Sequence, residues 1–214
     1  GPAYEVCDDD YDGIGSYDLS TLDETLLDGQ TGVSISYYES QEDADNATNV
    51  LDVNYQNTIP DNQTLYVRLE VDETGCYATT TQELIVNPIP TVLIGPAYEV
   101  CDDDYDGIGS YNLSTLDETL LDGQTGVSIS YYESQEDADN ATNVLDVNYQ
   151  NTITDTQTLY VRLEVDETGC YATTTQELIV NPLPEIITPT PLEECDDDYD
   201  GIVSFFDLSQ KTEE

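Results

Sequence analysis

Seven residues, Cys-Asp-Asp-Asp-Tyr-Asp-Gly, occur three times in this chain of 214 residues, beginning at Cys7, Cys101 and Cys195. Shifting the sequence against itself by 94 residues matches almost every position of the first unit. A unit of this length exceeds one turn of a solenoid and suits a small domain with its own core. We therefore expect repeat 1 at residues 1–90, repeat 2 at residues 91–184, and the truncated start of a third repeat at residues 185–214.

The charge of the chain narrows the range of partners. It has 47 acidic residues, three basic residues and no histidine, which gives a net charge of -44. Such a polyanion is repelled by nucleic acid and by anionic membranes. Disorder is the other common meaning of high charge, but 17 tyrosines and alternating Val, Ile, Leu and Thr favour a folded chain. No apolar run of membrane-spanning length and no signal-peptide pattern is present, so we expect no direct membrane insertion.

Strand periodicity dominates each repeat. Residues 32–39 alternate apolar and polar side chains, and residues 64–72 do the same. In the second segment Leu65, Val67, Leu69 and Val71 should face a core, and Arg68 should face outward. A turn at residues 72–75 would then form a hairpin with the next strand. Short helices are expected at residues 21–27, capped by Ser20, and at residues 41–47, capped by Ser40.

These patterns predict an all-β fold, with tandem immunoglobulin-like β-sandwich domains and short peripheral helices. The connectors at residues 87–96 and 181–191 are rich in proline, which favours extended, semi-rigid backbone. We call them the first linker and the second linker. The domains should therefore be arranged as a rod.

Two cysteines occur in each complete repeat, and no metal-binding CxxC pair is present. This count predicts one disulfide per domain, Cys7 with Cys76 and Cys101 with Cys170, and an oxidising compartment. A loop of that length would contribute roughly 4 kcal/mol in the chain-entropy model. Buried free thiols are the alternative.

The acidic segment has the spacing of a calcium-binding loop. Counted from Asp8, carboxylates fall at positions one, three and five, glycine at six and a backbone carbonyl at seven. Hard oxygen ligands favour calcium over zinc, copper or magnesium. A solvated acidic turn without an ion is the alternative. The candidate ligands are Asp8, Asp10, Asp12, Ile14 and Asp18 in repeat 1; Asp102, Asp104, Asp106, Ile108 and Asn112 in repeat 2; and Asp196, Asp198, Asp200, Ile202 and Asp207 in the third repeat.

Histidine-dependent catalysis is impossible in this chain, and we expect no enzymatic activity. Exposed tyrosines could form a platform for glycans, although strand packing is the commoner role of such residues. The candidate tyrosines are Tyr37, Tyr38, Tyr55, Tyr66 and Tyr77.

The acidic segments together with the stretches at residues 36–40, 63–68, 74–79 and 86–90 resemble repeats of giant secreted surface proteins of the Bacteroidota. That group includes the gliding-motility adhesins, which are exported by the type IX secretion system and carry many immunoglobulin-like domains. The resemblance implies an extracellular, cell-surface location and a structural or adhesive segment of a long fibre. Other repeats, further copies in a multi-chain filament, and surface glycans or other cells are the partners to expect.

Two rival functions remain open from the sequence: an array of glycan-binding modules, and the accessory stalk of a secreted polysaccharide-degrading enzyme. The position of the acidic segment directly after a linker adds one expectation. Calcium should lie near the junction between domains and help to fix the angle between them.

Overall fold

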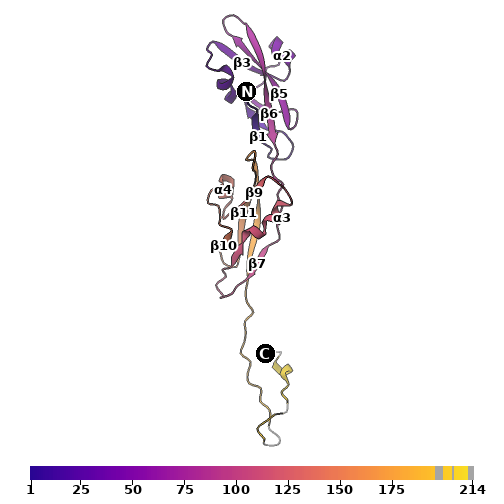
Figure 1. The fold of residues 1–214 in the computed structure, drawn as a ribbon, viewed down its shortest axis with the longest axis vertical. Coiled ribbons are helices and arrows are strands. Elements are labelled where there is room, and N and C mark those ends of the chain that lie inside the picture. The colour runs from indigo at the N-terminus through magenta and orange to yellow at the C-terminus, as the bar shows by residue number, and fades with distance from the viewer. Residues whose placement is uncertain (196–199, 204, 212–214) are drawn as a thin grey trace.

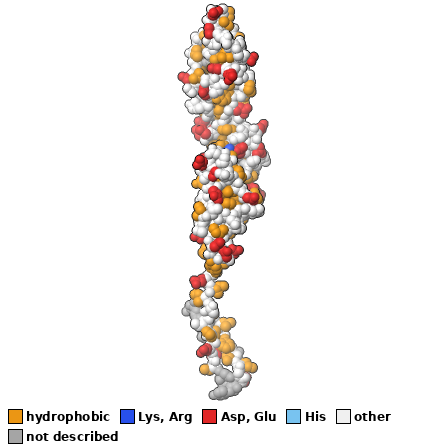
Figure 2. Space-filling model, turned by 90° about the vertical axis from the view of Figure 1, so that its left-hand side faces the viewer, with side chains coloured by type: hydrophobic (Ala, Val, Ile, Leu, Met, Phe, Trp, Pro, Cys, Tyr) orange, Lys and Arg blue, Asp and Glu red, His pale blue; other side chains and the backbone are white. Residues whose placement is uncertain are grey.

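The computed structural model describes residues 1–195, 200–203 and 205–211. Its two complete repeats lie end to end, and an extended tail follows repeat 2 (Figure 1). Acidic side chains are spread over both repeats on the face shown in Figure 2. Within the described part of the chain, no helix is long and apolar enough to cross a membrane.

The two repeats contain the same elements in the same order. In repeat 1 they are β1 (Tyr4–Cys7), β2 (Ser16–Asp18), η1 (Leu19–Leu22), α1 (Asp23–Leu27), β3 (Val33–Tyr38), α2 (Gln41–Asn46), β4 (Asn54–Gln56), β5 (Asn62–Val71) and β6 (Tyr77–Asn87). In repeat 2 they are β7 (Tyr98–Cys101), β8 (Ser110–Asn112), η2 (Leu113–Thr115), α3 (Asp117–Leu121), β9 (Val127–Tyr132), α4 (Gln135–Asn140), β10 (Asn148–Gln150), β11 (Thr156–Val165) and β12 (Tyr171–Asn181). A short helix, η3 (Leu208–Lys211), follows in the tail.

A long antiparallel hairpin, β5 with β6, forms the centre of repeat 1. β3 adds to β5 in antiparallel orientation, and β1 adds to the other side of β6 in parallel orientation. β2 and β4 form a separate two-stranded sheet. The expectation of an all-β fold with short helices is confirmed. Each repeat has six strands, one fewer than the seven of a constant-type immunoglobulin domain, so the immunoglobulin-like assignment is not established.

The core of each repeat lies between these sheets. Leu65 and Val67 on β5 and Leu84 on β6 are fully buried, as strand alternation predicts. Tyr17 on β2 and Tyr55 on β4 close the other side of the same cluster. Val71, at the turn end of β5, was expected in the core but is exposed.

The two short helices begin as local capping dictates, with one difference. Ser40 accepts a hydrogen bond from the Asp43 backbone N–H at 3.1 Å and caps α2, as predicted. The prediction that Ser20 caps the helix at residues 21–27 is wrong. The capping side chain there is that of Asp18, which accepts a hydrogen bond from the Ser20 N–H at 3.1 Å. The first turn there is a 3₁₀ helix, and α1 follows it.

Arg68 is buried, so its expected outward position is wrong. Its guanidinium donates to the backbone carbonyl of Ala44 in α2 at 2.9 Å and pairs with Glu70 at 2.6 Å. The guanidinium carbon also lies 3.4 Å from the centroid of the Tyr77 ring. α2 lies over this side of the sheet, and the long polar side chain satisfies the helix carbonyls that would otherwise be orphaned there.

Candidate functional site

The disulfide of this structure joins the two repeats. Cys7 is bonded to Cys170, with 5.5 Å between their Cα atoms. Cys76 and Cys101 are free and exposed, as is Cys195. The predicted pairs within each domain, Cys7 with Cys76 and Cys101 with Cys170, are therefore wrong.

The position at which β1 pairs along β6 explains the error. β1 runs parallel to β6, and Cys7 lies opposite Asn87, the last residue of β6. Cys76 directly precedes the first residue of this 11-residue strand. The two cysteines of one repeat are therefore separated by the length of β6, roughly 35 Å, whereas a disulfide requires Cα atoms within about 7 Å. Each repeat carries one cysteine at each end, and the count alone could not show that the ends differ.

The first linker is packed between the repeats. Pro90 is buried, and its carbonyl accepts a hydrogen bond from the Tyr11 hydroxyl at 2.9 Å. One residue on, the backbone N–H and carbonyl of Thr91 each bond the side-chain amide of Gln124 at 2.9 Å. Val92 then packs against the core cluster of repeat 2. The linker therefore touches both repeats, and its conformation is fixed by them.

A pocket of about 460 Å³ lies beside the disulfide at this junction. Its wall combines the acidic segment of repeat 1, the linker and the start of β12. The lining residues are Cys7, Asp8, Asp9, Tyr11, Ile89, Val92, Tyr171, Ala172 and Thr173. The acidic segment of repeat 1 thus belongs to the junction. The expectation that the segment directly after a linker lies at that linker is wrong, because residues 101–107 follow the first linker but lie at the far end of β12, beside Asn181.

Three carboxylates converge in each acidic loop. Those of Asp8, Asp10 and Asp12 each place an oxygen within 4.8 Å of the other two. Asp8 is buried and accepts the backbone N–H of Gly13 at 3.0 Å, which ties the loop closed. Partial desolvation raises the pKa of Asp10, and the hydrogen bond and negative charge of Asp12 raise it further. Like charges are therefore crowded together in this loop.

The loop of repeat 2 has the same arrangement with a more complete hydrogen-bond set. Asp102, Asp104 and Asp106 form the corresponding group. Burial acts to raise the pKa of Asp102, but four backbone N–H donors, from Gly107 and residues 104–106, outweigh it and hold that pKa below its ordinary value.

The glycine at the sixth loop position is required for two reasons. Gly13 has a φ of +74°, a region that side-chain-bearing residues rarely adopt. A Cβ atom there would also lie 2.7 Å from the Asp61 carboxylate and 3.0 Å from Pro60. Close packing of the loop against residues 60 and 61 therefore excludes larger residues.

The remaining candidate ligands divide into two groups. Ile14 lines a polar pocket together with Asp10 and Asp12, and Ile108 does so with Asp104 and Asp106. The proposed closing ligands lie elsewhere: Asp18 caps η1, and Asn112 accepts a hydrogen bond from Ser114 at 2.8 Å. Among the described residues, Asp18 does not belong to the group that Asp8, Asp10 and Asp12 form.

The third acidic loop is described only in part. Asp196 and Asp198 lie outside the described residues. The carboxylate of Asp200 accepts the Ile202 N–H at 2.7 Å. Asp207 accepts from the N–H and the hydroxyl of Ser209 at the start of η3, so it repeats the capping role of Asp18.

The loops in repeats 1 and 2 have the donor set of a hard cation. Three carboxylates and a neighbouring backbone carbonyl supply oxygen alone, and calcium takes about six to eight oxygen ligands, some of them from water. Without Asp18 or Asn112 the protein supplies fewer ligands than expected. The loops fit a partly hydrated calcium ion.

The tyrosines expected to form a glycan platform are mostly structural. Tyr37, Tyr38 and Tyr55 are buried, and of the five candidates only Tyr77 is exposed while Tyr66 is half-buried. The Tyr37 hydroxyl donates to the Leu19 carbonyl at 3.0 Å and to Asp23 at 2.7 Å. These rings therefore pack the core, and they do not form a contiguous exposed surface.

A family model matches both repeats, at residues 3–90 and 97–184. Its description is "Flavobacterium inter-domain disulphide bond domain". This description agrees with the bond between Cys7 and Cys170. No curated protein is similar enough to this chain to count as a match.

Similar solved structures include an endo-fucoidan hydrolase, MfFcnA4, of glycoside hydrolase family 107, at 10% identity and a TM-score of 0.21. This chain covers 28% of that protein, and the match spans 86% of this chain. The bradyzoite antigen BSR4 of Toxoplasma gondii matches 76% of this chain and 69% of its own at 10% identity, with a TM-score of 0.20. Protocadherin gamma B7 extracellular domains 1–4 match 85% and 49% at 8% identity, with a TM-score of 0.22. Such low scores carry no conclusion about this chain.

Proposed function

Because the chain belongs to the Flavobacterium inter-domain disulphide bond domain family, we propose that it is a structural segment of an extracellular fibre whose repeats are bonded covalently to one another. The two tandem repeats and the disulfide fit a repeat segment of an extracellular protein, since such bonds persist in oxidising compartments. A mechanical and adhesive role at the cell surface, in a protein of the gliding-motility adhesin type exported by the type IX system, is the finer part of the proposal. No catalytic role is included.

The observation that carries this proposal is the path of the covalent chain. Cys7 and Cys170 lie 163 residues apart in sequence but are directly bonded. Tension applied at the two ends passes from residue 7 through the disulfide to residue 170. The residues between them are bypassed, so unfolding them would not lengthen the fibre. A segment built in this way resists extension even if one domain opens.

The packed linker adds lateral stiffness to this covalent connection. Tyr11 from repeat 1 and Gln124 from repeat 2 hold neighbouring linker residues, Pro90 and Thr91, through hydrogen bonds. The disulfide on the same junction prevents the repeats from separating. Two attachments at one junction restrain bending more than a single flexible linker would.

Calcium is the cofactor that we propose for the acidic loops. Asp8, Asp10, Asp12 and the carbonyl of Ile14 would hold it in repeat 1, with the corresponding residues in repeat 2. The ion would neutralise the crowded carboxylates and stiffen a loop that also carries Cys7 and Tyr11. Support comes from the convergence of the carboxylates and their place at the junction.

Calorimetry with calcium tests this second part. We expect binding, with a raised melting temperature that a chelator reverses. The double variant Asp10→Asn and Asp104→Asn should lose the binding, whereas Asp72→Asn, in the exposed hairpin turn of repeat 1, should retain it. Absence of binding at millimolar calcium would contradict the calcium proposal and leave the covalent fibre untouched.

Single-molecule stretching from the two chain ends tests the mechanical proposal. The oxidised chain should extend less than the reduced chain by roughly 500 Å, the contour length of the bypassed residues. Cys7→Ser should behave like the reduced chain, and Cys101→Ser should behave like the oxidised one. Equal extension of the oxidised and reduced chains would contradict the proposal.

A further inference from the structure

The pocket beside the disulfide is a composite of both repeats, and we call it the junction pocket. Its walls come from the acidic loop of repeat 1, the first linker and the start of β12 in repeat 2. It therefore lies between two complete repeats. Its volume of about 460 Å³ is within the usual range for small-molecule sites, which often lie between domains.

The ring of Tyr11 in this pocket is held in place and open to a ligand. Its hydroxyl donates to the Pro90 carbonyl at 2.9 Å, yet the residue is 58% exposed. Its backbone has a φ of +65°, which is uncommon for a bulky side chain. Outliers of this kind are concentrated at functional sites. Tyr11 is not one of the tyrosines that the sequence led us to expect in a glycan platform.

The second ring of the junction pocket, Tyr171, is fixed by an arginine. The guanidinium carbon of Arg162 lies 3.4 Å from the centroid of this ring, and Arg162 pairs with Glu164 at 2.6 Å. The guanidinium therefore covers one face of the ring and sets its orientation. Thr173 also lines the pocket. Its hydroxyl accepts a hydrogen bond from Gln135 at 3.1 Å and keeps its own hydrogen to donate.

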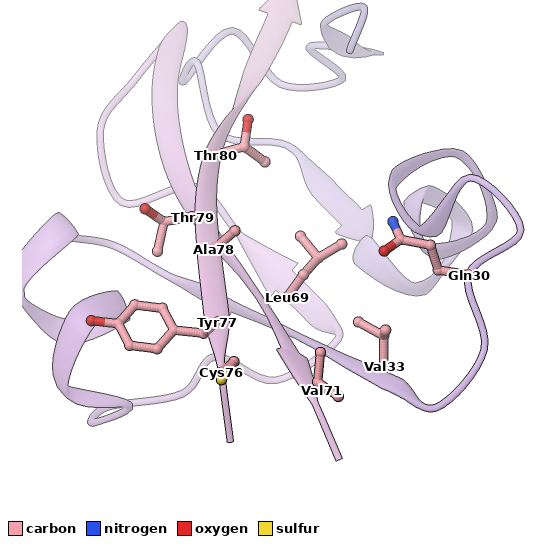
Figure 3. A pocket seen from close by; sticks show the side chains of 9 residues that line it. All are labelled: Gln30, Val33, Leu69, Val71, Cys76, Tyr77, Ala78, Thr79 and Thr80. Carbon is pink, nitrogen blue, oxygen red and sulfur yellow. The ribbon is translucent and has the colours of Figure 1, made fainter. Parts of the chain in front are cut away.

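The same strand end in repeat 1 shows how these side chains are presented. In Figure 3, Tyr77 and Thr79 project to one side of β6 and Ala78 to the other. Alternation along the strand gives Tyr171 and Thr173 the same relation in β12. An aromatic ring and a hydroxyl therefore lie next to each other on one side of the strand.

The charge of the pocket wall excludes anionic ligands. Asp8 and Asp9 line the junction pocket, and none of the described residues that line it is basic. Asp8 is buried, and its oxygens accept the N–H groups of Gly13 at 3.0 Å and Asp10 at 3.3 Å. Asp9 is exposed and provides an acceptor for a ligand. An anion would be repelled by this wall and by the net charge of -44.

A neutral sugar fits the pocket better than a cation does. A cation would meet one accessible carboxylate, that of Asp9, but it would also approach the Arg162 guanidinium on the Tyr171 ring. A pyranose ring presents C–H groups that pack against the two tyrosine rings and the apolar linker side chains. Its hydroxyls can donate to Asp9 and accept from Thr173.

We propose that the junction pocket binds a neutral hexose unit of a glycan, with Tyr11 and Tyr171 packing on the sugar and Asp9 accepting hydrogen bonds from its hydroxyls. The inference rests on the adhesive part of the proposed function and gives it a class of partner. The site needs both repeats, because its two rings come from different repeats. The covalent fibre is tested by stretching and the glycan site by binding, so each can fail without the other.

The test titrates the full oxidised chain with defined probes and follows the NMR signals of the tyrosine rings. The neutral probes are cellohexaose, laminarihexaose and mannohexaose, the anionic probe is hexagalacturonate, and the cationic probe is spermine. Moderate salt screens non-specific attraction of the cation. At least one neutral hexaose should bind at millimolar concentration or below and shift the ring signals of Tyr11 and Tyr171. Hexagalacturonate should leave these signals unchanged, and spermine should shift them less.

Matched variants separate the pocket from the fold. Tyr171→Ala should lower the affinity for the bound hexaose at least ~10-fold. Tyr77→Ala removes the equivalent ring and its stacking on Arg68 in repeat 1, and it should leave the affinity unchanged. Tyr11→Ala should likewise lower the affinity at least ~10-fold. Tyr105→Ala, at the same loop position of repeat 2, should not, because Tyr105 does not line this pocket.

Two further variants test the carboxylate and the composite wall. Asp9→Asn should retain more of the binding than Asp9→Ala, because the amide keeps a hydrogen-bond acceptor. Cys7→Ser should weaken the binding, because it releases the repeat 1 wall of the pocket from the repeat 2 wall.

The proposal would be overturned if none of the three neutral hexaoses shifted the ring signals of Tyr11 and Tyr171. Equal affinities in Tyr171→Ala and Tyr77→Ala would overturn it as well. Tighter binding of spermine, lost equally in Asp9→Asn and Asp9→Ala, would show that the pocket is a cation site. Unchanged affinity in Cys7→Ser would contradict a site made from both repeats.

Discussion

The first and second linkers begin with nearly the same residues but differ in their burial and in their contacts with the repeats. The first has its Pro90 buried and its Val92 packed against repeat 2, whereas the second has Pro184 exposed and Ile186 89% exposed. Prolines restrict the backbone of both. Proline content alone therefore does not hold such a linker in place, and the surface of the following repeat does. Stiffness belongs to the junction as a unit.

The largest effect should come from removing the covalent part of the first junction. Cys7→Ser opens a loop closed across 163 residues of sequence, which the chain-entropy model values at about 5 kcal/mol of unfolding free energy. Cys101→Ser changes the corresponding cysteine next to the second linker, where no disulfide is present, and should leave stability unchanged. Denaturant unfolding of the oxidised proteins measures both. Equal losses of unfolding free energy in the two variants would contradict the claim that only the first junction is held by a disulfide.

The second-largest loss of stability should come from disrupting the apolar contact of the first linker. Val92→Asp should cost about 2 kcal/mol, since it removes packing against the repeat 2 core and brings a charge near it. Ile186→Asp, at the same position of the second linker, should cost nothing in the dilute monomer because that side chain is exposed. Thermal and denaturant melts of both variants give the comparison. A destabilised Ile186→Asp monomer would show that the second linker is also packed.

A smaller effect should follow from the amide that holds Thr91. Gln124→Ala removes both hydrogen bonds to the linker backbone and should cost about 1 kcal/mol. Gln30→Ala, the matched change in repeat 1, should have no effect, because the side chain of Gln30 is exposed. Hydrogen exchange at the Thr91 amide should rise in the first variant alone. An unchanged exchange rate would show that this pair does not order the linker.

Lowering the pH should destabilise both repeats alike. Acid unfolding therefore provides a reference for the effects of variants at the junction. Hydrogen bonds from Ser40, Asn49 and Thr48 hold the pKa of Asp43 below its ordinary value of 3.8, and Asp137 is lowered in the same way. The stabilisation is complete above that value and is lost as the pH falls below it. Asp43→Asn and Asp137→Asn should each flatten this part of the acid-stability curve by a similar small amount. A response confined to one variant would show that the repeats differ in more than the junction.

Local chemistry made most of the fold predictable from sequence. Alternation identified β3 and β5, the turn at residues 72–75 identified the hairpin, and Ser40 identified the start of α2. Arg68 was misplaced because a single strand's alternation does not show which face a helix will cover. The capping role of Asp18 was not foreseen, because a capping carboxylate and a ligating carboxylate look the same in sequence.

The disulfide pairing depended on which end of β6 pairs with β1, and the cysteine count does not contain that information. Parallel pairing of β1 with β6 sends Cys7 to the end of the repeat opposite Cys76. Pairing of β1 with the first residues of β6 would instead have brought Cys7 near Cys76. The acidic loops were located correctly as carboxylate groups, and the position of the repeat 1 loop at the junction follows from the same strand pairing.

Peptide mapping of the unreduced chain under conditions that block thiol exchange tests the central claim most directly. The account predicts one disulfide-linked peptide pair that contains Cys7 and Cys170, with Cys76 and Cys101 alkylated as free thiols in the monomer. Recovery of Cys7 joined to Cys76, and of Cys101 joined to Cys170, would contradict it, because each repeat would then be closed on itself and tension would pass through the linker alone.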